Sequence, residues 1–404
     1  MINKIKTALL TLLVTTVSSP AATESNPSNA NDLAAASAAS ACNELGFKLY
    51  RAVSKSSGNL FFSPYSIETA LAMTATGAEQ ETLKQMLATL HLRPNFGPDF
   101  KALQNKLASG DDFKLLVANR IWAQIGVTYY PDFLSNLSKH FGSEAVLLDF
   151  KTKTETARSD INQWVQNQTQ GKIKDLLKPG MISKEIELVL TNAIYFKGSW
   201  AHEFLKDSTV DGTFHPSAST KHPVQFMNQT NNFLYNETVD LQYLQLAYKG
   251  QLVMDVLLPK AGVTLGSIES KLTTSMFFDL VKQPQHREVS VTLPKFKVES
   301  QFDLGDTLAQ LGMPLAFDRH KANFRKIRKL GADETLSISK VIHKAFVEVN
   351  EEGTVAAAAT AVTMIPTSSV GPPPTEFKAD RPFMFFIRHT ESGAILFAGR
   401  FQSP

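Results

Sequence analysis

A long, nearly uncharged segment close to the C-terminus constrains the fold of this 404-residue chain more than any other feature. Between Gly353 and Phe377 the only charged residue is Glu376. An alanine run at 356–359 would propagate a helix, but a glycine precedes it, β-branched residues follow it, and Pro366 ends regular structure. Alternate positions carry only small side chains, namely Thr354, Ala356, Ala358, Thr360 and Val362. The segment can therefore be exposed in one state and packed as a strand in another.

The same segment resembles the hinge and reactive centre loop of the serpins, a family of serine protease inhibitors. Matching sequence also flanks it, at 344–350 before the hinge and at 377–383 and 396–400 after it. The resemblance covers roughly residues 31 to 404 and implies an α+β fold: a single domain with three β-sheets, about nine helices and an exposed reactive centre loop at about 351–376. It also assigns the hinge residues, which are Glu351, Gly353, Thr354, Ala356, Ala358 and Thr360.

The resemblance further implies a mechanism in which the protein is a suicide substrate. A target serine protease attacks one peptide bond of the loop, and the cleaved arm inserts into the main sheet as a new strand. The protease, still acylated, is carried to the opposite pole and distorted, so the expected partner is a protease held in a one-to-one covalent complex. The family spacing from Gly353 places the reactive bond between Thr367 and Ser368, with cleavage at Ser368 or Val370 left open by a longer downstream loop.

Loop composition predicts the class of protease. No Lys or Arg lies between Gly353 and Phe377, so a trypsin-like enzyme has no bond to attack there. Thr367 is small and would underfill a chymotrypsin-like pocket. Elastase-like serine proteases are therefore the expected targets. Two alternatives stay open: a non-inhibitory serpin with a carrier, chaperone or storage role, and a cross-class inhibitor of papain-like cysteine proteases.

The resemblance assigns two further regions, and in the first of them Ser63 and Ser66 are polar residues in an apolar setting. One is the shutter, a hydrogen-bonded cluster beneath the point where two central strands part, formed by Ser63, Ser66, Asn192 and His343. The other is the breach at the top of the sheet, formed by Trp200, Lys295 and Glu351, in which the last two form an ion pair. Ser63 also reads as a helix cap, because Pro64 follows it at the first helical position.

The N-terminus has the layout of a signal peptide. Lys4 and Lys6 precede an apolar run at 8–17, and small residues follow that run. The run is too short to span a bilayer as a stable helix. We expect residues 1–22 to be a signal peptide, 23–31 a polar linker and 32–404 the serpin domain of a secreted, extracellular or periplasmic protein. A disordered leader is the alternative for residues 1–22.

Composition and motifs exclude several classes of function. The chain is 43% hydrophobic and 20% charged, with a net charge of +3, which argues against a dominant polyanionic partner such as a nucleic acid. We also expect a monomer with no membrane partner. A basic cluster at 321–329 leaves a polyanionic activator open, although a solvated face is the simpler interpretation. The single cysteine, Cys42, lies on an apolar helical face and cannot form an internal disulfide.

Catalytic motifs are missing from the sequence. There is no Gly-x-Ser-x-Gly nucleophile elbow, no glycine-rich phosphate loop and no cysteine pair for zinc. His343 has no Ser and Asp partners marked out in the sequence, so a structural role is favoured over that of a general base. We expect no enzymatic activity, no cofactor and no metal.

Overall fold

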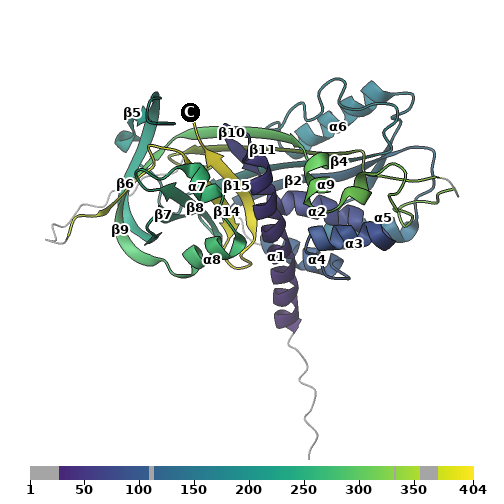
Figure 1. Cartoon of the computed structure of the whole chain (residues 1–404), viewed down its shortest axis with the longest axis horizontal. Helices are drawn as coiled ribbons and strands as arrows, with labels where there is room; N and C mark the ends of the chain where they lie inside the picture. The colour runs from purple at the N-terminus through teal and green to yellow at the C-terminus, as the bar shows by residue number, and fades with distance from the viewer. Residues whose placement is uncertain (1–26, 109–112, 332–333, 355–371) are drawn as a thin grey trace, which may run out of the picture.

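The computed structural model describes residues 27–108, 113–331, 334–354 and 372–404, and two β-sheets organise these residues (Figure 1). The main sheet has six strands: β10 (Phe296–Asp303), β11 (Lys340–Asn350), β12 (Gly353–Thr354), β4 (Leu188–Ser199), β2 (Phe113–Gln124) and β3 (Ala145–Leu148), in this order. β4 and β11 run parallel to each other, whereas β10 and β2 are antiparallel to their central neighbours.

The second sheet has nine strands. Its order is β1 (Leu60–Phe62), β15 (Ile395–Phe401), β14 (Phe383–His389), β8 (Leu252–Pro259), β7 (Leu241–Ala247), β6 (His222–Glu237), β9 (Gln285–Pro294) and β13 (Thr375–Lys378), with β5 (Val210–Phe214) paired to β6. β6 pairs with β5 and β9 along most of its length and with β7 at its end. The long β6 therefore joins two of the three expected sheets into one within the described residues.

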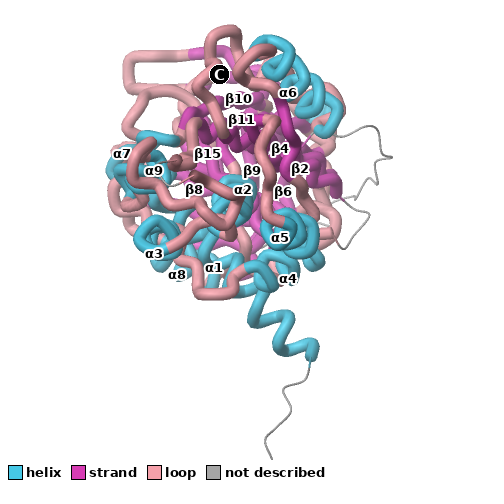
Figure 2. The backbone as a smooth tube through the Cα atoms, turned by 90° about the vertical axis from the view of Figure 1, so that its right-hand side faces the viewer, coloured by secondary structure: helices cyan, strands magenta, loops and turns pink. Residues whose placement is uncertain are grey.

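The described residues form nine α-helices, as expected. They are α1 (Pro27–Val53), α2 (Pro64–Ala75), α3 (Gln80–Thr89), α4 (Gly97–Leu107), α5 (Pro131–Phe141), α6 (Thr154–Gln168), α7 (Leu265–Glu269), α8 (Thr274–Lys282) and α9 (Gly305–Leu311). α6 lies on one face of the main sheet and α2 on the other, with α3, α4 and α5 beside α2 (Figure 1). Figure 2 shows the strands between α6 and the group of α1, α4 and α5. None of the described helices is long and apolar enough to cross a membrane.

α1 begins earlier than the sequence predicts. Its first residue, Pro27, falls inside the range 23–31 that was expected to be a polar linker, so that prediction is wrong for residues 27–31. Proline suits the first turn of a helix, and the alanine-rich stretch at 34–41 propagates it. The predicted signal peptide at 1–22 lies outside the described residues. Cys42 is buried in α1, as its apolar helical face predicts.

α2 is buried along its whole length beneath the main sheet. Pro64 is its first residue, and the hydroxyl of Ser63 accepts a hydrogen bond from the Ser66 backbone N–H at 3.1 Å. This confirms Ser63 as the cap. Capping fixes the position at which the buried helix begins, and hence where Ser66 meets the sheet.

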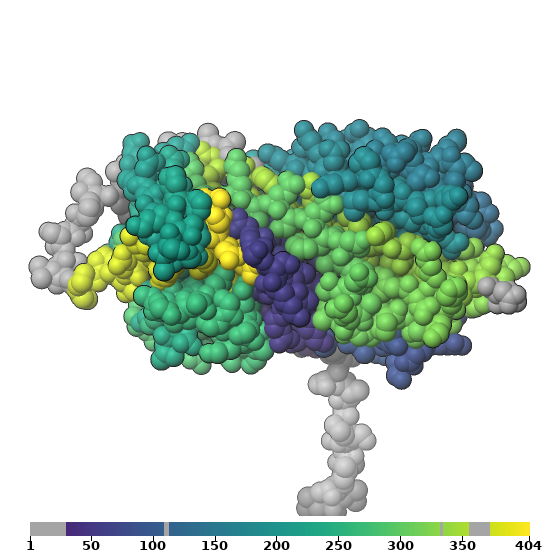
Figure 3. All heavy atoms as spheres, turned by 45° about the horizontal axis from the view of Figure 1, so that its top comes forward, coloured from purple at the N-terminus to yellow at the C-terminus, as the bar shows by residue number. Residues whose placement is uncertain are grey.

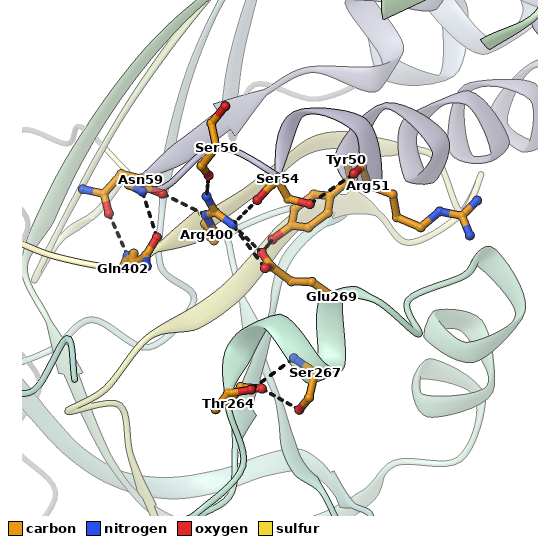
Figure 4. Close-up of polar contacts among 11 residues, drawn as sticks. Tyr50, Arg51, Ser54, Ser56, Asn59, Thr264, Ser267, Glu269, Arg400 and Gln402 are labelled. Atoms are coloured by element: carbon orange, nitrogen blue, oxygen red, sulfur yellow. Dashed lines mark hydrogen bonds and ion pairs between the residues drawn. The ribbon is translucent and has the colours of Figure 1, made fainter. Parts of the chain in front are cut away.

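A buried polar network attaches the last strand to the first helix (Figure 4). Arg400 on β15 donates through Nη1 to Glu269 Oε1 at 3.0 Å, and Tyr50 on α1 donates to the same oxygen at 2.9 Å. Arg400 Nε also donates to the Gly58 carbonyl at 2.8 Å. Both members of this buried ion pair, Arg400 and Glu269, therefore make further hydrogen bonds, which is the condition for such a pair to be tolerated inside a protein.

Candidate functional site in the main sheet

The two central strands of the main sheet are paired along one part and separated along another. Residues 189–195 of β4 pair in parallel register with 340–346 of β11. Above this pairing, β12 occupies the space between the two strands and is antiparallel to both, with Thr354 opposite Val349 and Gly198. We call the β4–β11 pairing the seam. The first residues after the turn at 351–352 thus already form the start of a new central strand.

Gly353 and Thr354, the two hinge residues that follow this turn, lie inside the sheet. Gly353 has a φ of 144°, and a Cβ there would lie 2.1 Å from the Gly198 carbonyl oxygen, so only glycine fits. Thr354 is fully buried, and its hydroxyl lies 2.7 Å from the hydroxyl of Tyr248. The small size of both residues is therefore a packing requirement. The hinge residues Ala356, Ala358 and Thr360 and the predicted reactive bond at Thr367 and Ser368 lie outside the described residues.

Trp200 holds the turn between β11 and β12. Its indole N–H donates to the Asn350 carbonyl and its backbone N–H to the Glu352 carbonyl, both at 3.0 Å. The indole stacks on Tyr248 with 4.3 Å between ring centroids and 14° between planes. Trp200 is 1% exposed, so the hinge packs against a buried pair of stacked aromatic rings.

Glu351 and Lys295 form an ion pair at the top of the sheet, with 3.1 Å between Oε1 and Nζ. Thr209 donates to the same carboxylate at 2.9 Å. Burial alone would raise the pKa of Glu351, but hydrogen bonds from its own backbone N–H, Thr209 and Lys295 outweigh this and hold the pKa below its usual value. The Glu351 side chain is 8% exposed and that of Lys295 is 35% exposed. The carboxylate therefore relies on these hydrogen-bond donors, whereas the Lys295 ammonium also has access to water.

The predicted shutter residues lie together on the α2 face of the seam. Asn192 on β4 donates to Asn119 Oδ1 on β2 at 2.7 Å, and its own Oδ1 accepts from Nδ1 of His343 on β11. Ser66 donates to Asn119 Oδ1 at 2.7 Å, and the Ser63 N–H donates to His343 Nε2 at 3.1 Å. This polar row crosses the sheet at one register position and is bonded from below by the start of α2.

The protonation of His343 follows from its partners. Nε2 accepts from a backbone N–H, so Nδ1 carries the hydrogen of a neutral imidazole. Full burial lowers the pKa of His343 to about 3. The ring is consequently a fixed hydrogen-bonding link across the seam, and we find no hydroxyl positioned for it to activate among its described hydrogen-bond partners.

Two residues of this site were not identified from the sequence. Asn119 supplies the oxygen that joins Ser66 to Asn192, and Tyr248 is the partner of Thr354. A single amide within strand β2 resembles an ordinary exposed position, and Tyr248 is one of several aromatic residues around strands β7 and β8. Either residue could have been identified only if the register between neighbouring strands had been known.

Comparison with known proteins decides the family. A family model described as serpin, serine protease inhibitor, matches residues 40–404. This chain belongs to the serpin family. Human leukocyte elastase inhibitor is 39% identical to this serpin over 380 residues, which cover 90% of this chain and 99% of the relative. An uncharacterized serpin-like protein of Thermococcus kodakarensis is 38% identical over 371 residues, covering 90% and 85% respectively.

Solved structures agree with the fold. The crystal structure of Serpin48 from the insect Tenebrio molitor matches with a TM-score of 0.81 and 31% identity, covering 91% of this chain and 98% of that one. These comparisons confirm the predicted family and the serpin fold, and the family is one of protease inhibitors and not of enzymes. Within the described residues, no group of three or more His, Cys, Asp or Glu side chains is placed to hold a metal ion.

Proposed function

We propose that this serpin is a suicide-substrate inhibitor of elastase-like serine proteases and traps the acyl-enzyme by inserting its cleaved loop along the seam. The observation that supports this most directly is β12. Two residues of the hinge already pair with both β4 and β11, so further insertion continues an existing strand and needs no new nucleus. The residues that follow in sequence, Ala356, Ala358 and Thr360, are small enough to enter the same interior.

The free energy available from such an insertion is of the right size. A strand of about 12 residues adds on the order of ten ladder hydrogen bonds at roughly 1 kcal/mol each. The resulting driving force of order 10 kcal/mol compares with the stability of a typical folded protein, about 5–15 kcal/mol. It is therefore sufficient to deform the active site of an attached protease.

Target class rests on the loop sequence and on the similarity to a leukocyte elastase inhibitor. The test is incubation with pancreatic elastase, chymotrypsin, trypsin and papain, followed by denaturing electrophoresis. We expect a complex that resists SDS with elastase, and mass spectrometry should find a released C-terminal fragment that begins at Ser368. A fragment beginning outside 368–371 would contradict the assigned bond. A complex only with papain would move the target to cysteine proteases.

The carrier alternative has the same test. Human thyroxine-binding globulin, solved with bound thyroxine, matches this serpin with a TM-score of 0.81 and 26% identity over 92% of this chain and 99% of that one. The fold therefore does not separate inhibitor from carrier. Loop cleavage by elastase without any stable complex would favour a non-inhibitory role.

We also propose that the protein is exported, on the strength of the charge and apolar pattern of residues 1–22. Expression of the full chain in a secreting host should release a shortened protein. N-terminal sequencing of that product should begin near residue 23, whereas retention of Met1 in the cell would contradict export.

A further inference from the structure

One glutamate on the buried helix α2 has no polar partner. Glu68 is fully buried, and neither of its carboxyl oxygens takes part in a hydrogen bond with any described residue. Its two oxygens are the only buried side-chain nitrogen or oxygen atoms in the described part of the chain that lack such a bond. A buried polar group without a partner destabilises a fold, so its presence needs a physical explanation.

The other buried acids among the described residues share one property, which is an ion pair with a basic side chain. They are Asp99, Asp255, Glu269 and Glu351, and their partners are Arg93, Arg388, Arg400 and Lys295 respectively. Glu68 has no such ion pair, and burial raises its pKa well above the usual value. The Glu68 carboxyl group is therefore the neutral acid in the folded protein.

Glu68 lies near the place where α1 packs on α2. Gly46 of α1 approaches Pro64, the first residue of α2, so closely that a Cβ on Gly46 would lie 2.8 Å from the proline side chain. Cys42 lies one helical turn before Gly46 on the same face of α1. Burial raises the pKa of the Cys42 thiol, and a charge on Glu68 would raise it further, so the two side chains are close. α1 reaches the surface in the space-filling view, in purple (Figure 3), whereas α2 is buried along its length.

No cation offsets a negative charge at this position. Cys42 is the titratable group that α1 contributes, and Tyr65, one turn before Glu68, is the buried titratable group of α2 itself. α4 contributes the uncharged Gln104, which hydrogen-bonds Tyr65, while its Lys106 pairs with acids elsewhere. Burial is the only influence on the pKa of Glu68, so no charged side chain of the described strands and helices around α2 compensates it.

A neutral buried acid couples folding to pH. In the unfolded chain Glu68 loses its proton above about pH 4.5, whereas the folded protein keeps it at higher pH. The folded state then binds one more proton than the unfolded state. The contribution of Glu68 to stability is consequently complete below pH 4.5 and falls as pH rises, and the equilibrium constant for unfolding increases about tenfold for each pH unit.

We propose that Glu68 is a proton-binding site of the native protein: α1 packs on α2 only while this carboxyl group carries a proton, which ties the folded state to neutral and mildly acidic surroundings. Ser66 and Glu68 are about 200° apart around the helix, so α2 directs Ser66 toward Asn119 of β2 and Glu68 away from it. An ionised Glu68 would have to reach water, and α1 would have to separate from the helix that bonds the polar row of the main sheet. This inference does not depend on protease trapping.

The range from about pH 6.5 to pH 8.5 isolates the effect of Glu68. Burial lowers the pKa of His343, so its stabilising contribution is complete above pH 6.5. The Cys42 thiol, whose pKa burial raises, begins to ionise in the unfolded chain only near pH 9. Among the described groups with a shifted pKa, Glu68 alone is neutral when folded and charged when unfolded throughout this range. Stability should therefore be greatest near pH 6.5.

Proton release on unfolding tests the proposal directly. The protein is unfolded with concentrated urea in unbuffered solution at pH 7.5, and a pH electrode records the protons released. The wild type should release about one proton more than Glu68→Gln, which keeps the shape of the side chain but cannot ionise. Glu68→Met, which leaves no polar atom unpaired, should give the same difference and replaces Glu68→Gln if that variant does not fold. A difference of zero would show that Glu68 is already ionised in the native protein and would overturn the proposal.

The pH dependence of stability gives a second measurement. Between pH 6.5 and pH 8.5 the urea concentration at the unfolding midpoint should fall for the wild type and stay constant for Glu68→Met. Glu81→Gln is the matched control, because Glu81 is a helical glutamate whose side chain is 55% exposed and pairs with Lys84. This control should match the wild type in proton release and in midpoint. An equal fall in midpoint for the wild type and Glu68→Met would assign the pH dependence to other groups and contradict the proposed site.

Discussion

At the scale of single residues, His343 links folding stability to pH. Its pKa in the folded protein, about 3, is below the 6.5 of an unperturbed histidine. The unfolded chain therefore takes up a proton first as pH falls, so stability contributed by this residue is complete above about pH 6.5 and is lost progressively toward pH 3. The loss amounts to about 1.4 kcal/mol for each pH unit in that window.

The His343→Gln variant measures this contribution. Urea unfolding of both proteins at pH 7.5 and pH 5 should show that the variant is less stable at pH 7.5 and that the difference shrinks at pH 5. Burial also lowers the pKa of His389, but His389 is present in both proteins and so cancels from the difference. A difference between the two proteins that does not change with pH would contradict the assigned role of His343.

Glu351 gives a second prediction at this scale. Glu351→Lys replaces an attraction to Lys295 by a repulsion at the top of the sheet. The free energy of unfolding should fall by roughly 1–3 kcal/mol, a value limited by the partial exposure of Lys295. With the breach weakened, the loop of one molecule can insert into another, and mild heating should produce polymers on native gels. The matched control is Glu352→Lys, whose partner Lys206 has a side chain that is 69% exposed. Equal polymer yields from both variants would rule out a special role for the buried carboxylate.

The sequence identified some members of the site and not others for a physical reason. Ser63 and Ser66 stand out as polar residues in an apolar setting, the family resemblance added Asn192 and His343, and the four do lie together. Asn119 has a neighbour, Arg120, that is just as polar, and it becomes part of the row only through its register with Asn192. Cross-strand register is a long-range property that periodicity along one strand does not encode.

At the scale of elements, β12 sets the condition for the proposed inhibition. Extension of this two-residue strand requires Thr354 to remain inside the sheet, where its hydroxyl meets Tyr248. In Thr354→Arg the guanidinium has no anionic partner there, so insertion should stall before the acyl-enzyme is trapped. The variant should be cleaved by elastase as a substrate, with the amount of stable complex reduced at least tenfold on denaturing gels.

Thr360→Ser is the conservative comparison for that experiment, since it shortens a later hinge side chain by one methyl group. It should keep full complex formation. Trapping by Thr354→Arg at the wild-type level would show that β12 does not have to carry this residue inward.

Element boundaries were harder to predict than element types. The mostly apolar runs at 186–200, 382–389 and 394–401 are typical of buried strands, and they correspond to β4, β14 and β15. The start of α1 was placed too late, because the polar residues 27–31 offer no apolar face before packing begins. Two of the expected sheets are joined because β6 is long, and the composition of the sequence does not predict that length.

At the scale of the whole molecule, the proposed mechanism requires the intact protein to store free energy that loop insertion releases. A single cut in the loop should allow the arm to insert fully and raise the melting temperature, in contrast to the usual effect of nicking a protein. Limited cleavage with elastase followed by calorimetry measures this change. In Thr354→Arg the same cut should give little or no increase. If the cut wild-type protein melts at or below the intact one, the strand does not insert and the inhibitory mechanism fails.

The network around Arg400 has a consequence for synthesis. β15 lies between β1 and β14, and Arg400 binds the Gly58 carbonyl 342 positions earlier in the chain. At about 5–20 residues per second, a ribosome needs roughly 20–70 s to make that interval. During this time the aromatic residues of β1 lack the strand with which they pair, and the Glu269 carboxylate, once made, has no guanidinium until Arg400 follows. The nascent chain therefore cannot close its core before its last residues emerge, and this delay would keep it unfolded long enough to be threaded through a translocation channel.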